Sequence, residues 1–310
     1  MPSNIKVTIL GSRGSYPVSG PGFETYGGHT SCVLLETENR QIFFDAGSGI
    51  INYGAQMLGD HLAREQAVNT SIIFSHSHFD HLIGLPYFPP IFHPSSTIHL
   101  VGPRSGYFAS FQKTIEHLVR SPFYPVALHE MGAQKNFYDI SEADSLFYLQ
   151  GSDEPLILRP QAPADAPRLP DPEDVDIRID CLRGYNHPKS GVNLYRLCVE
   201  DTTVVYATDT EGYVHGDQRL AEFSRGADLL IHDAMYTEEH YTSMPVPTQG
   251  YGHSTVRIAT KLASMADVDT LCLFHHDPSS TDDVLDDVGH LAKEYFPDTV
   301  VAKDGLTFHL

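Results

Sequence analysis

The sequence predicts an α/β fold in which packed β-sheets are flanked by helices. Two observations predict it: strand-like runs outnumber helical ones, and several strand-like runs follow one another directly, which a single doubly wound sheet does not require. The chain has 310 residues, of which 41% are hydrophobic, so it can bury a large core. We therefore expect one domain that spans residues 1–310.

Strand and helix patterns alternate in the first third of the chain. Short β-rich runs predict strands at 6–10, 31–37, 41–47 and 71–75, followed by "STIHLVGP". Helical apolar spacing predicts helices at 49–63 and 105–120. Later strands are predicted for "VDIRID", "NLYRLCVE", "TTVVYATD", "ADLLIHDA", "TLCLFHH" and "LTFHL", with helices near 216–225, 254–266 and 282–295.

The segment 151–176 differs from its surroundings in composition. It is rich in proline and aspartate and carries many more acidic than basic residues. This composition is typical of a long surface loop. We expect an acidic insertion in the domain here, not a linker between domains.

Charge and hydropathy restrict the partners of the chain. The formal net charge is −20, so tRNA or DNA would be repelled at long range unless a basic patch overrides the total. No apolar run is long enough to span a bilayer, and the start of the chain lacks a signal-peptide pattern. We expect a cytoplasmic protein without a membrane partner. The scattered cysteines predict reduced, buried thiols: Cys32, Cys181, Cys198 and Cys272.

The most informative stretch is "FSHSHFDHLIG", which follows the predicted strand 71–75. It places four ligand-type side chains within six positions, namely His76, His78, Asp80 and His81. Residues two apart at the end of a strand can point the same way, and imidazole and carboxylate groups are ligands for transition metals. A polar loop that caps a helix is the simpler alternative, but four such residues in so short a stretch favour a metal site.

Three further candidate ligands follow later in the chain. His187, Asp209 and His275 each stand at or shortly after the end of a predicted strand, in "YNHPKSG", "YATDTEG" and "LFHHDP". A carboxylate can bridge two metals because each oxygen can bind one, whereas an imidazole donates to only one. These residues extend the first motif toward a dinuclear site.

The pattern HxHxDH, followed by His, Asp and His on later strands, resembles that of the metallo-β-lactamase-fold hydrolases. The resemblance runs from "TILGSRGSYP" to "LCLFHHDP" and implies an αββα sandwich of two mixed β-sheets with a binuclear metal site on one edge. Zinc, manganese or iron suits such ligands. The implied ligands are His76, His78 and His187 for one metal, Asp80, His81 and His275 for the second, and Asp209 as the bridge.

The resemblance also implies roles around the metals. A hydroxide between the two divalent ions would be the nucleophile, because metal binding lowers the pKa of water to roughly 7. Asp80 counts both as a ligand and as a catalytic residue. Asp45 is expected to support the ligands without binding metal, and His276 to face away from the site.

Two later motifs resemble the ribonuclease Z and cyclic nucleotide phosphodiesterase branch of this superfamily. "LLIHDAMYTEEH" has Asp233 where ribonuclease Z has glutamate, and "GYGHSTVRIA" carries His253. The resemblance implies that His253 contacts the scissile phosphate and protonates the leaving oxygen, oriented by Asp233. Helical spacing from Ser254 onward puts His253 at a helix N-terminus, which favours phosphate.

These features predict a metal-dependent phosphoric diester hydrolase. We expect a small phosphodiester, with a 3′,5′-cyclic nucleotide as first candidate, because an acidic segment 151–176 replaces the basic arm with which ribonuclease Z holds tRNA. Aromatic residues near the motifs offer stacking surfaces or core packing: Phe79, Tyr87, Tyr185, Tyr236 and Tyr251. The resemblance further implies a homodimer.

Two alternatives stay open. The first is a ribonuclease Z-like tRNA 3′-processing endonuclease, which would need a basic patch assembled from scattered residues. The second is a non-hydrolytic diiron protein that binds oxygen or senses redox state, since histidine and aspartate also bind iron. Redox relatives typically carry glutamate in the first motif, where this chain has His78, and pair with a flavin module that this chain lacks.

Overall fold

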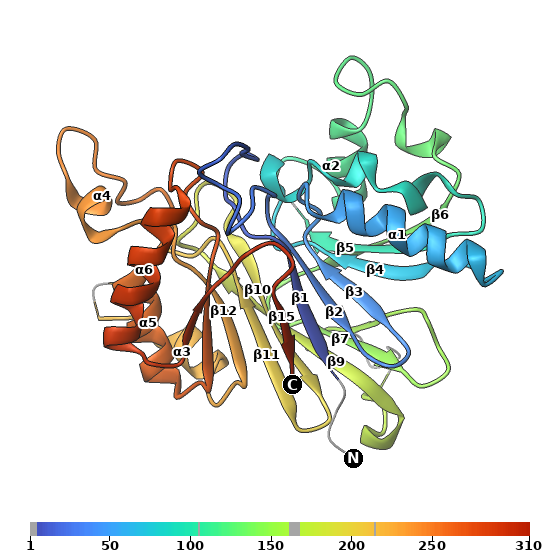
Figure 1. Ribbon diagram of the computed structural model, residues 1–310. Coiled ribbons are helices and arrows are strands. Elements are labelled where there is room, and N and C mark those ends of the chain that lie inside the picture. The colour runs from blue at the N-terminus through green and yellow to red at the C-terminus, as the bar shows by residue number, and fades with distance from the viewer. Residues whose placement is uncertain (1–4, 105, 161–167, 214) are drawn as a thin grey trace.

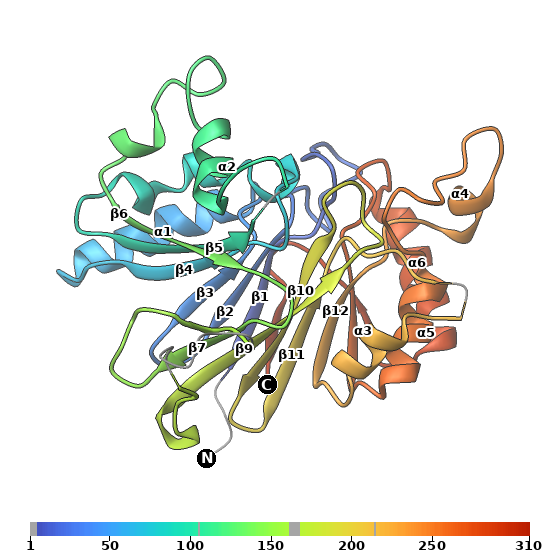
Figure 2. The same cartoon turned by 180° about the vertical axis from the view of Figure 1, so that it is seen from behind.

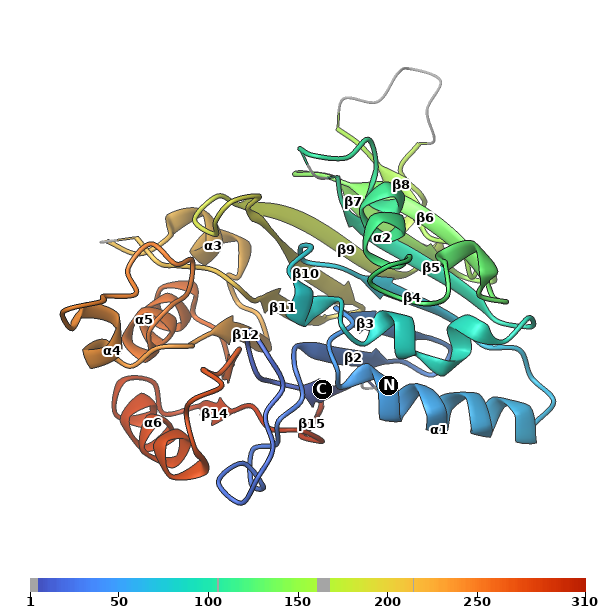
Figure 3. The same ribbon diagram turned by 90° about the horizontal axis from the view of Figure 1, so that it is seen from above.

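The computed structural model describes residues 5–104, 106–160, 168–213 and 215–310. Two mixed β-sheets pack face to face, and helices cover the outer face of each sheet (Figure 1). This arrangement is the αββα sandwich expected from the sequence. Figure 3 shows the four layers from above, with α1 and α2 on one side and α5 and α6 on the other.

The first sheet contains seven strands among the described residues. Antiparallel pairing joins its first four strands, and parallel pairing joins the rest. In spatial order the strands are β15 (Thr307–His309), β1 (Lys6–Gly11), β2 (Cys32–Glu36), β3 (Gln41–Phe44), β4 (Asn69–Ile73), β5 (Thr97–Pro103) and β6 (Gln134–Ile140).

The second sheet contains eight strands among the described residues. The first four pair in parallel and the remainder are antiparallel. In spatial order they are β14 (Thr299–Val301), β13 (Thr270–Phe274), β12 (Leu229–Asp233), β11 (Thr202–Ala207), β10 (Val192–Val199), β9 (Val175–Gly184), β7 (Ser145–Leu149) and β8 (Leu156–Leu158).

The helices lie on both outer faces. The first sheet is covered by α1 (Ile50–Ala63) and α2 (Phe111–Leu118), and the second by α3 (Gln218–Phe223), α5 (Val256–Ala266) and α6 (Asp282–Tyr295). The short helix α4 (Glu238–Thr242) projects from the side of the molecule that carries α5 and α6, as the view from behind shows (Figure 2). The 3₁₀ helices are η1 (Phe79–His81), η2 (Leu85–Tyr87), η3 (Pro89–Phe92), η4 (Leu128–Glu130) and η5 (Pro172–Asp174).

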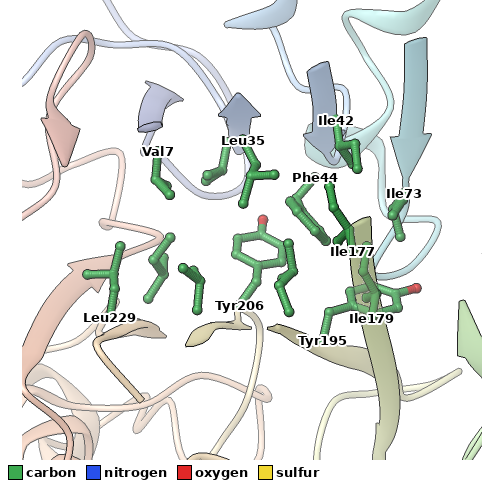
Figure 4. Close-up of a cluster of buried hydrophobic side chains, with 14 of the residues drawn as sticks. Val7, Leu35, Ile42, Phe44, Ile73, Ile177, Ile179, Tyr195, Tyr206 and Leu229 are labelled. Carbon is green, nitrogen blue, oxygen red and sulfur yellow. The ribbon is translucent and has the colours of Figure 1, made fainter. Parts of the chain in front are cut away.

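The core explains why these residues form these strands. Successive side chains of a strand point to opposite faces, so β2 sends Val33 and Leu35 toward the second sheet and Cys32 and Leu34 toward the helices. Figure 4 shows the layer between the sheets, where Phe44 of the first sheet meets side chains of the second. The central strands β2, β3, β11 and β12 are buried on both faces, which is why their sequences read as nearly continuous apolar runs.

Several strand ends meet at one edge of the sandwich. Strands β1, β3, β4, β9, β11, β12 and β13 run in the same direction within their sheets. The loops after their carboxyl ends therefore gather at this edge. These loops carry the predicted ligands and the glycine-rich stretch after β1.

The structure corrects three expectations. The segment 151–176 is not only a loop, because it contains the edge strand β8 and the start of β9; its residues 161–167 lie outside the described part. The helix expected at 105–120 covers only α2, which begins after its N-cap Ser110. The strands β6, β7 and β14 were not predicted. None of the described helices combines the length and apolar character that a bilayer crossing requires.

The acidic segment lies far from the edge that carries the predicted ligands. Arg40, in the turn before β3, donates to Asp176 at the start of β9 (2.8 Å) and to the carbonyl of Leu149 (2.6 Å). Strand β9 has 10 residues, and His187 follows its other end. At about 3.3 Å per residue, roughly 30 Å separate the start of β9 from His187.

Candidate metal centre

The structure brings the seven predicted ligands together in two groups. In the first group, the Nε2 of His187 lies 3.0 Å from the Nδ1 of His78. The Nε2 atoms of His76 and His187 each lie 3.6 Å from Oδ2 of Asp209. His76, His187 and Asp209 are buried, whereas His78 is exposed and forms the open side of the group.

The second group faces the other oxygen of Asp209. Its Oδ1 lies 3.2 Å from the Nε2 of His81 and 3.3 Å from the Nε2 of His275. Asp80 completes this group, because its Oδ2 lies 3.2 Å from the Nε2 of His275. The two oxygens of one carboxylate thus point into two different groups of potential ligands.

The donor atoms suit divalent metals. Ligands held at about 2.1 Å around a tetrahedral ion lie about 3.4 Å apart, close to the separations in both groups. The Nε2 of His76 is buried and has no hydrogen-bond partner among the described residues. A buried polar atom without a partner is costly, and a metal ion would satisfy it.

For most of the candidate ligands, the direction of the pKa shift favours the form that binds metal. Burial and neighbouring imidazoles hold the pKa of His76 well below its usual value, and burial with His187 lowers the pKa of His78 to about 4. Burial raises the pKa of the Asp209 carboxyl, but the surrounding histidines outweigh it and hold the pKa well below normal. Neutral imidazoles and ionised carboxylates are the forms that bind metal.

His81 is the exception among the histidines. Burial lowers its pKa, but Asp209, Asp80 and Asp45 outweigh burial and hold the pKa well above its usual value. This shift favours the protonated imidazole, which is not the form that binds metal. Metal binding must displace this proton.

Asp45 holds His81 from behind. Its Oδ2 lies 2.8 Å from the Nδ1 of His81 and accepts hydrogen bonds from the hydroxyls of Tyr206 (2.8 Å) and Ser75 (2.7 Å). Its Oδ1 accepts the backbone N–H of Ser75 at 2.8 Å. A carboxylate in this position fixes the ring orientation of a metal-binding histidine.

The glycine-rich stretch after β1 closes one side of the site. The backbone N–H of Ser15 donates to Oδ2 of Asp80 at 2.7 Å. A Cβ atom at Gly14 would lie 2.4 Å from the His275 ring, so only glycine allows the chain to pass here. The sequence placed this stretch close to the site without a role in binding nucleotide phosphates, and the contacts with Asp80 and His275 show that it adjoins the ligands.

Backbone strain concentrates at the same edge. Asp45, Asp209 and His275 each follow a strand and have positive φ angles of 59°, 53° and 60°. Residues other than glycine rarely adopt this left-handed conformation, and its cost is typical of functional sites. In each case the turn directs the side chain from a strand end toward the ligand groups.

His253 and Asp233 form a pair beside the ligands. The Nδ1 of His253 lies 2.7 Å from Oδ2 of Asp233, so the shorter aspartate still reaches the histidine. The His253 ring stacks on that of His275, with centroids 4.9 Å apart. Burial lowers the pKa of His253, but the Asp233 carboxylate outweighs it and raises the pKa to about 9.

The position of His253 relative to the helix needs a correction. Helix α5 begins at Val256, and Thr255 caps it by accepting the backbone N–H of Ile258. His253 therefore precedes the cap and is not itself the first residue of the helix. Asp233 also fixes the next residue, because its Oδ1 accepts the backbone N–H of Ser254 at 3.0 Å.

Glu211 is a site residue that sequence reasoning missed. Its Oε1 accepts the backbone N–H of Gly250 at 2.8 Å and the Tyr241 hydroxyl, and its Oε2 accepts the backbone N–H of Gly252 at 2.9 Å. The carbonyl of Gly252 in turn lies 3.1 Å from the Nδ1 of His187. Glu211 therefore connects the end of β11 with the loop that carries His253. Its place two residues after Asp209 was the only signal in the sequence.

Two other histidines lie outside the ligand groups. The Nε2 of His276 bonds the carbonyl of Ala302 at 2.9 Å, so this side chain points away from the ligands as expected. The Nδ1 of His29 bonds the hydroxyl of Ser48 at 3.2 Å.

Comparison with known protein families decides the affiliation of the chain. The model of the beta-lactamase superfamily domain matches residues 40–276. The chain belongs to the metallo-β-lactamase superfamily. This family comprises hydrolases, and the αββα sandwich described above is its fold.

Similar sequences come from the ribonuclease Z branch. A ribonuclease Z of Picrophilus torridus is 24% identical and covers 100% of this chain and 97% of its own. A ribonuclease Z of Prochlorococcus marinus strain NATL1A is 28% identical, with 99% of both chains covered. The resemblance to this branch, first seen in the motifs around Asp233 and His253, is confirmed.

Solved structures share the fold over the whole chain. The metallo-β-lactamase fold protein YhfI of Bacillus subtilis is 21% identical, with a TM-score of 0.64 and coverage of 99% and 100% of the two chains. The short form of human tRNase Z is 19% identical, with a TM-score of 0.57 and 98% of both chains covered. Zn²⁺-bound PqqB of Methylobacterium extorquens is 13% identical, with a TM-score of 0.62 and coverage of 98% and 100%.

Proposed function

We propose that the chain is a binuclear metal-dependent phosphodiesterase in which His253 protonates the leaving oxygen. The observation that carries this proposal is the Asp233–His253 pair, whose 2.7 Å contact lies directly beside the ligand His275. Hydrolysis of a phosphodiester expels an alkoxide, which needs a proton. A protonated histidine held next to the metal site supplies one.

The site contains two sets of residues: those that would bind the metal ions and those that would transfer a proton. His76, His78 and His187 would hold one divalent ion, Asp80, His81 and His275 the other, and Asp209 would bind both. Two such ions would lower the pKa of water to about 7 and neutralise the charge of the phosphate.

Within this arrangement His253 acts through one nitrogen. Asp233 occupies its Nδ1, which leaves Nε2 to hand a proton to the substrate. The raised pKa keeps the imidazole protonated at neutral pH. Glu211 and Gly252 hold the loop on which this histidine lies.

For the substrate class, the comparisons support the tRNA 3′-processing alternative better than the cyclic nucleotide. Relatives named ribonuclease Z match this chain over nearly its entire length. The position of the acidic segment also weakens the argument against RNA, because roughly 30 Å separate the start of β9 from His187. The segment 104–120, which contains helix α2, has three basic residues and one acidic residue. Its Thr114 lines a pocket that also includes the ligands His76 and His78.

A small phosphodiester such as a 3′,5′-cyclic nucleotide is the second candidate. The formal net charge of −20 favours it, because a polymeric anion meets the repulsion of the whole molecule. A single phosphate at the metal centre is governed by the local charge of the ions.

Product analysis by chromatography tests both candidates together. Zinc- or manganese-loaded protein is incubated with a precursor tRNA that carries a 3′ trailer, with 3′,5′-cyclic nucleotides and with a 2′,3′-cyclic nucleotide. The His253→Ala variant with the same metal content is the control. We expect cleavage of the tRNA precursor or of a cyclic nucleotide by the parent protein, with a large loss in the variant.

Two outcomes would contradict the proposal. Absence of cleavage of every phosphodiester by protein that holds two metals per chain would remove the phosphodiesterase function. An iron–oxo absorption band in protein that hydrolyses none of these substrates would support the diiron alternative instead.

A further inference from the structure

A pocket of about 500 Å³ opens next to the first ligand group. Three segments form it: the turn with His76 and His78, the stretch from the end of β5 toward α2, and the loop after His187. We call it the Tyr107 pocket and define it by His78, Pro103, Tyr107, Phe108, Pro188 and Lys189. Its volume lies within the range of small-molecule sites.

The walls of the Tyr107 pocket are mostly apolar and aromatic. Tyr107 is 77% exposed, and Pro103, Phe108 and Pro188 form most of the apolar lining beside it. An exposed aromatic residue next to a catalytic centre offers a stacking surface to a planar ligand. Since His78 is both a candidate ligand and part of the wall, the pocket is continuous with the metal centre.

The charge of the pocket differs from that of the rest of the chain. The protein contains 40 acidic and 20 basic residues, yet none of the described residues that line the pocket is acidic. Lys189 is exposed at the pocket, and no carboxylate of the described residues forms a salt bridge with its ammonium group. A lone cation beside an apolar wall suits a ligand that is aromatic and anionic.

We propose that the Tyr107 pocket receives a nucleobase of the substrate, which stacks on Tyr107 while Lys189 faces the attached phosphate. The proposal rests on the phosphodiesterase function and specifies its substrate as a nucleotide. Both an RNA end and a cyclic nucleotide contain a nucleobase with a phosphate attached to its ribose. None of the aromatic residues singled out from the sequence lines the pocket.

Calorimetric titration tests the base site separately from catalysis. Metal-loaded protein is titrated with adenosine 5′-monophosphate and with ribose 5-phosphate, which lacks the base. We expect the parent protein to bind the adenine nucleotide roughly 5- to 100-fold more tightly, since base stacking on an aromatic side chain is worth that much. Tyr107→Ala should lose most of this difference, whereas Lys189→Ala should weaken both ligands to a similar degree.

The matched control is Tyr295→Ala, which removes an exposed tyrosine from the distant helix α6 and should change neither affinity. Thermal melting verifies that each variant is folded. A parallel titration with a ribotrinucleotide distinguishes the two candidate substrates. A site for an RNA end should bind the trinucleotide more tightly than the mononucleotide, whereas a site for a cyclic nucleotide should not.

Equal affinity of the parent protein for the two phosphates, or an unchanged difference in Tyr107→Ala, would overturn the base site. Failure of the adenine nucleotide to bind at millimolar concentration would do the same. Hydrolysis of methyl 4-nitrophenyl phosphate, which has no base, reports on the phosphodiesterase function alone. We expect the distant control variant Tyr295→Ala to hydrolyse this ester like the parent protein.

Discussion

His253 is protonated at neutral pH because the Asp233 carboxylate lies 2.7 Å from its Nδ1. A general acid works only in its protonated form, so activity that depends on His253 is present below its pKa of about 9 and is lost as the pH rises through that value. The pH dependence of the reaction therefore reports on the protonation of His253 in the Asp233–His253 pair.

Asp233→Asn should move the alkaline limb of the kcat/KM profile to lower pH. The asparagine removes the charge that raises the pKa of His253 and leaves the burial that lowers it. At pH 8 the variant should consequently lose most of its activity relative to its own maximum. The measurement is a pH–rate profile of metal-loaded protein. An alkaline limb that stays in place would show that another group supplies the proton.

Asp209→Ala should abolish the binding of two metals per chain. Each oxygen of Asp209 faces a different ligand group, so the substitution removes one ligand from both. Elemental analysis after dialysis measures the metal content, and Asp269→Ala, an exposed aspartate, is the control. Retention of two tightly bound ions in Asp209→Ala would contradict the bridging role.

The close spacing of ligand-type residues and their positions at the ends of predicted strands sufficed to identify the seven candidate metal ligands from the sequence. His76 to His81 stand out by their density, and His187, Asp209 and His275 by following predicted strands. Glu211 could not be found in this way, since its role depends on backbone N–H groups of Gly250 and Gly252, about 40 residues away, that local sequence does not specify.

At the level of elements, Glu211 braces the loop between α4 and α5. Glu211→Gln should reduce kcat roughly 10- to 100-fold, as is typical for residues that orient metal ligands, with a smaller effect on KM. Glutamine keeps one accepting oxygen and replaces the other with an NH2 group, so it cannot accept the N–H groups of Gly250 and Gly252 with two separate oxygens as Glu211 does. The carbonyl of Gly252 in turn contacts His187. Tyr241→Phe, which removes one donor to Glu211, should have a milder effect.

Hydrogen exchange distinguishes this brace from general destabilisation. In Glu211→Gln the amides of Gly250 and Gly252 should exchange faster, while those of β10 keep their protection. Unchanged exchange in this loop together with unchanged kcat would remove Glu211 from the site.

The elements themselves were predictable where the apolar pattern is long. Strands β1 to β5 and helices α1, α5 and α6 follow from their periodicity. The edge strand β8 has only three residues beside a proline-rich stretch, and β6 carries polar and half-buried side chains, so neither shows a clear signal. Pairing supplies what the local pattern lacks: β6 pairs with β5, 37 residues earlier in the chain, and β8 pairs with the preceding strand β7.

At the level of the whole molecule, the acidic segment and the metal centre occupy opposite ends of the sandwich. We expect that replacing Asp171, Glu173 and Asp174 by their amides leaves kcat/KM within about twofold for any substrate, because surface charges this far apart are screened at physiological salt. Steady-state kinetics at 0.15 M salt measures the effect. A large gain for the tRNA precursor alone would show that the segment repels RNA after all.

The dependence of the His253→Ala defect on the leaving group tests the central claim most directly. The measurement compares kcat/KM of the parent protein and the variant, matched in metal content, for a ribose ester and for a 4-nitrophenyl ester of the same nucleotide. A ribose alkoxide needs a proton and a nitrophenolate does not, so the variant should lose roughly 10²- to 10⁴-fold on the first ester and little on the second. Equal losses on both esters would contradict the role of His253 as the general acid.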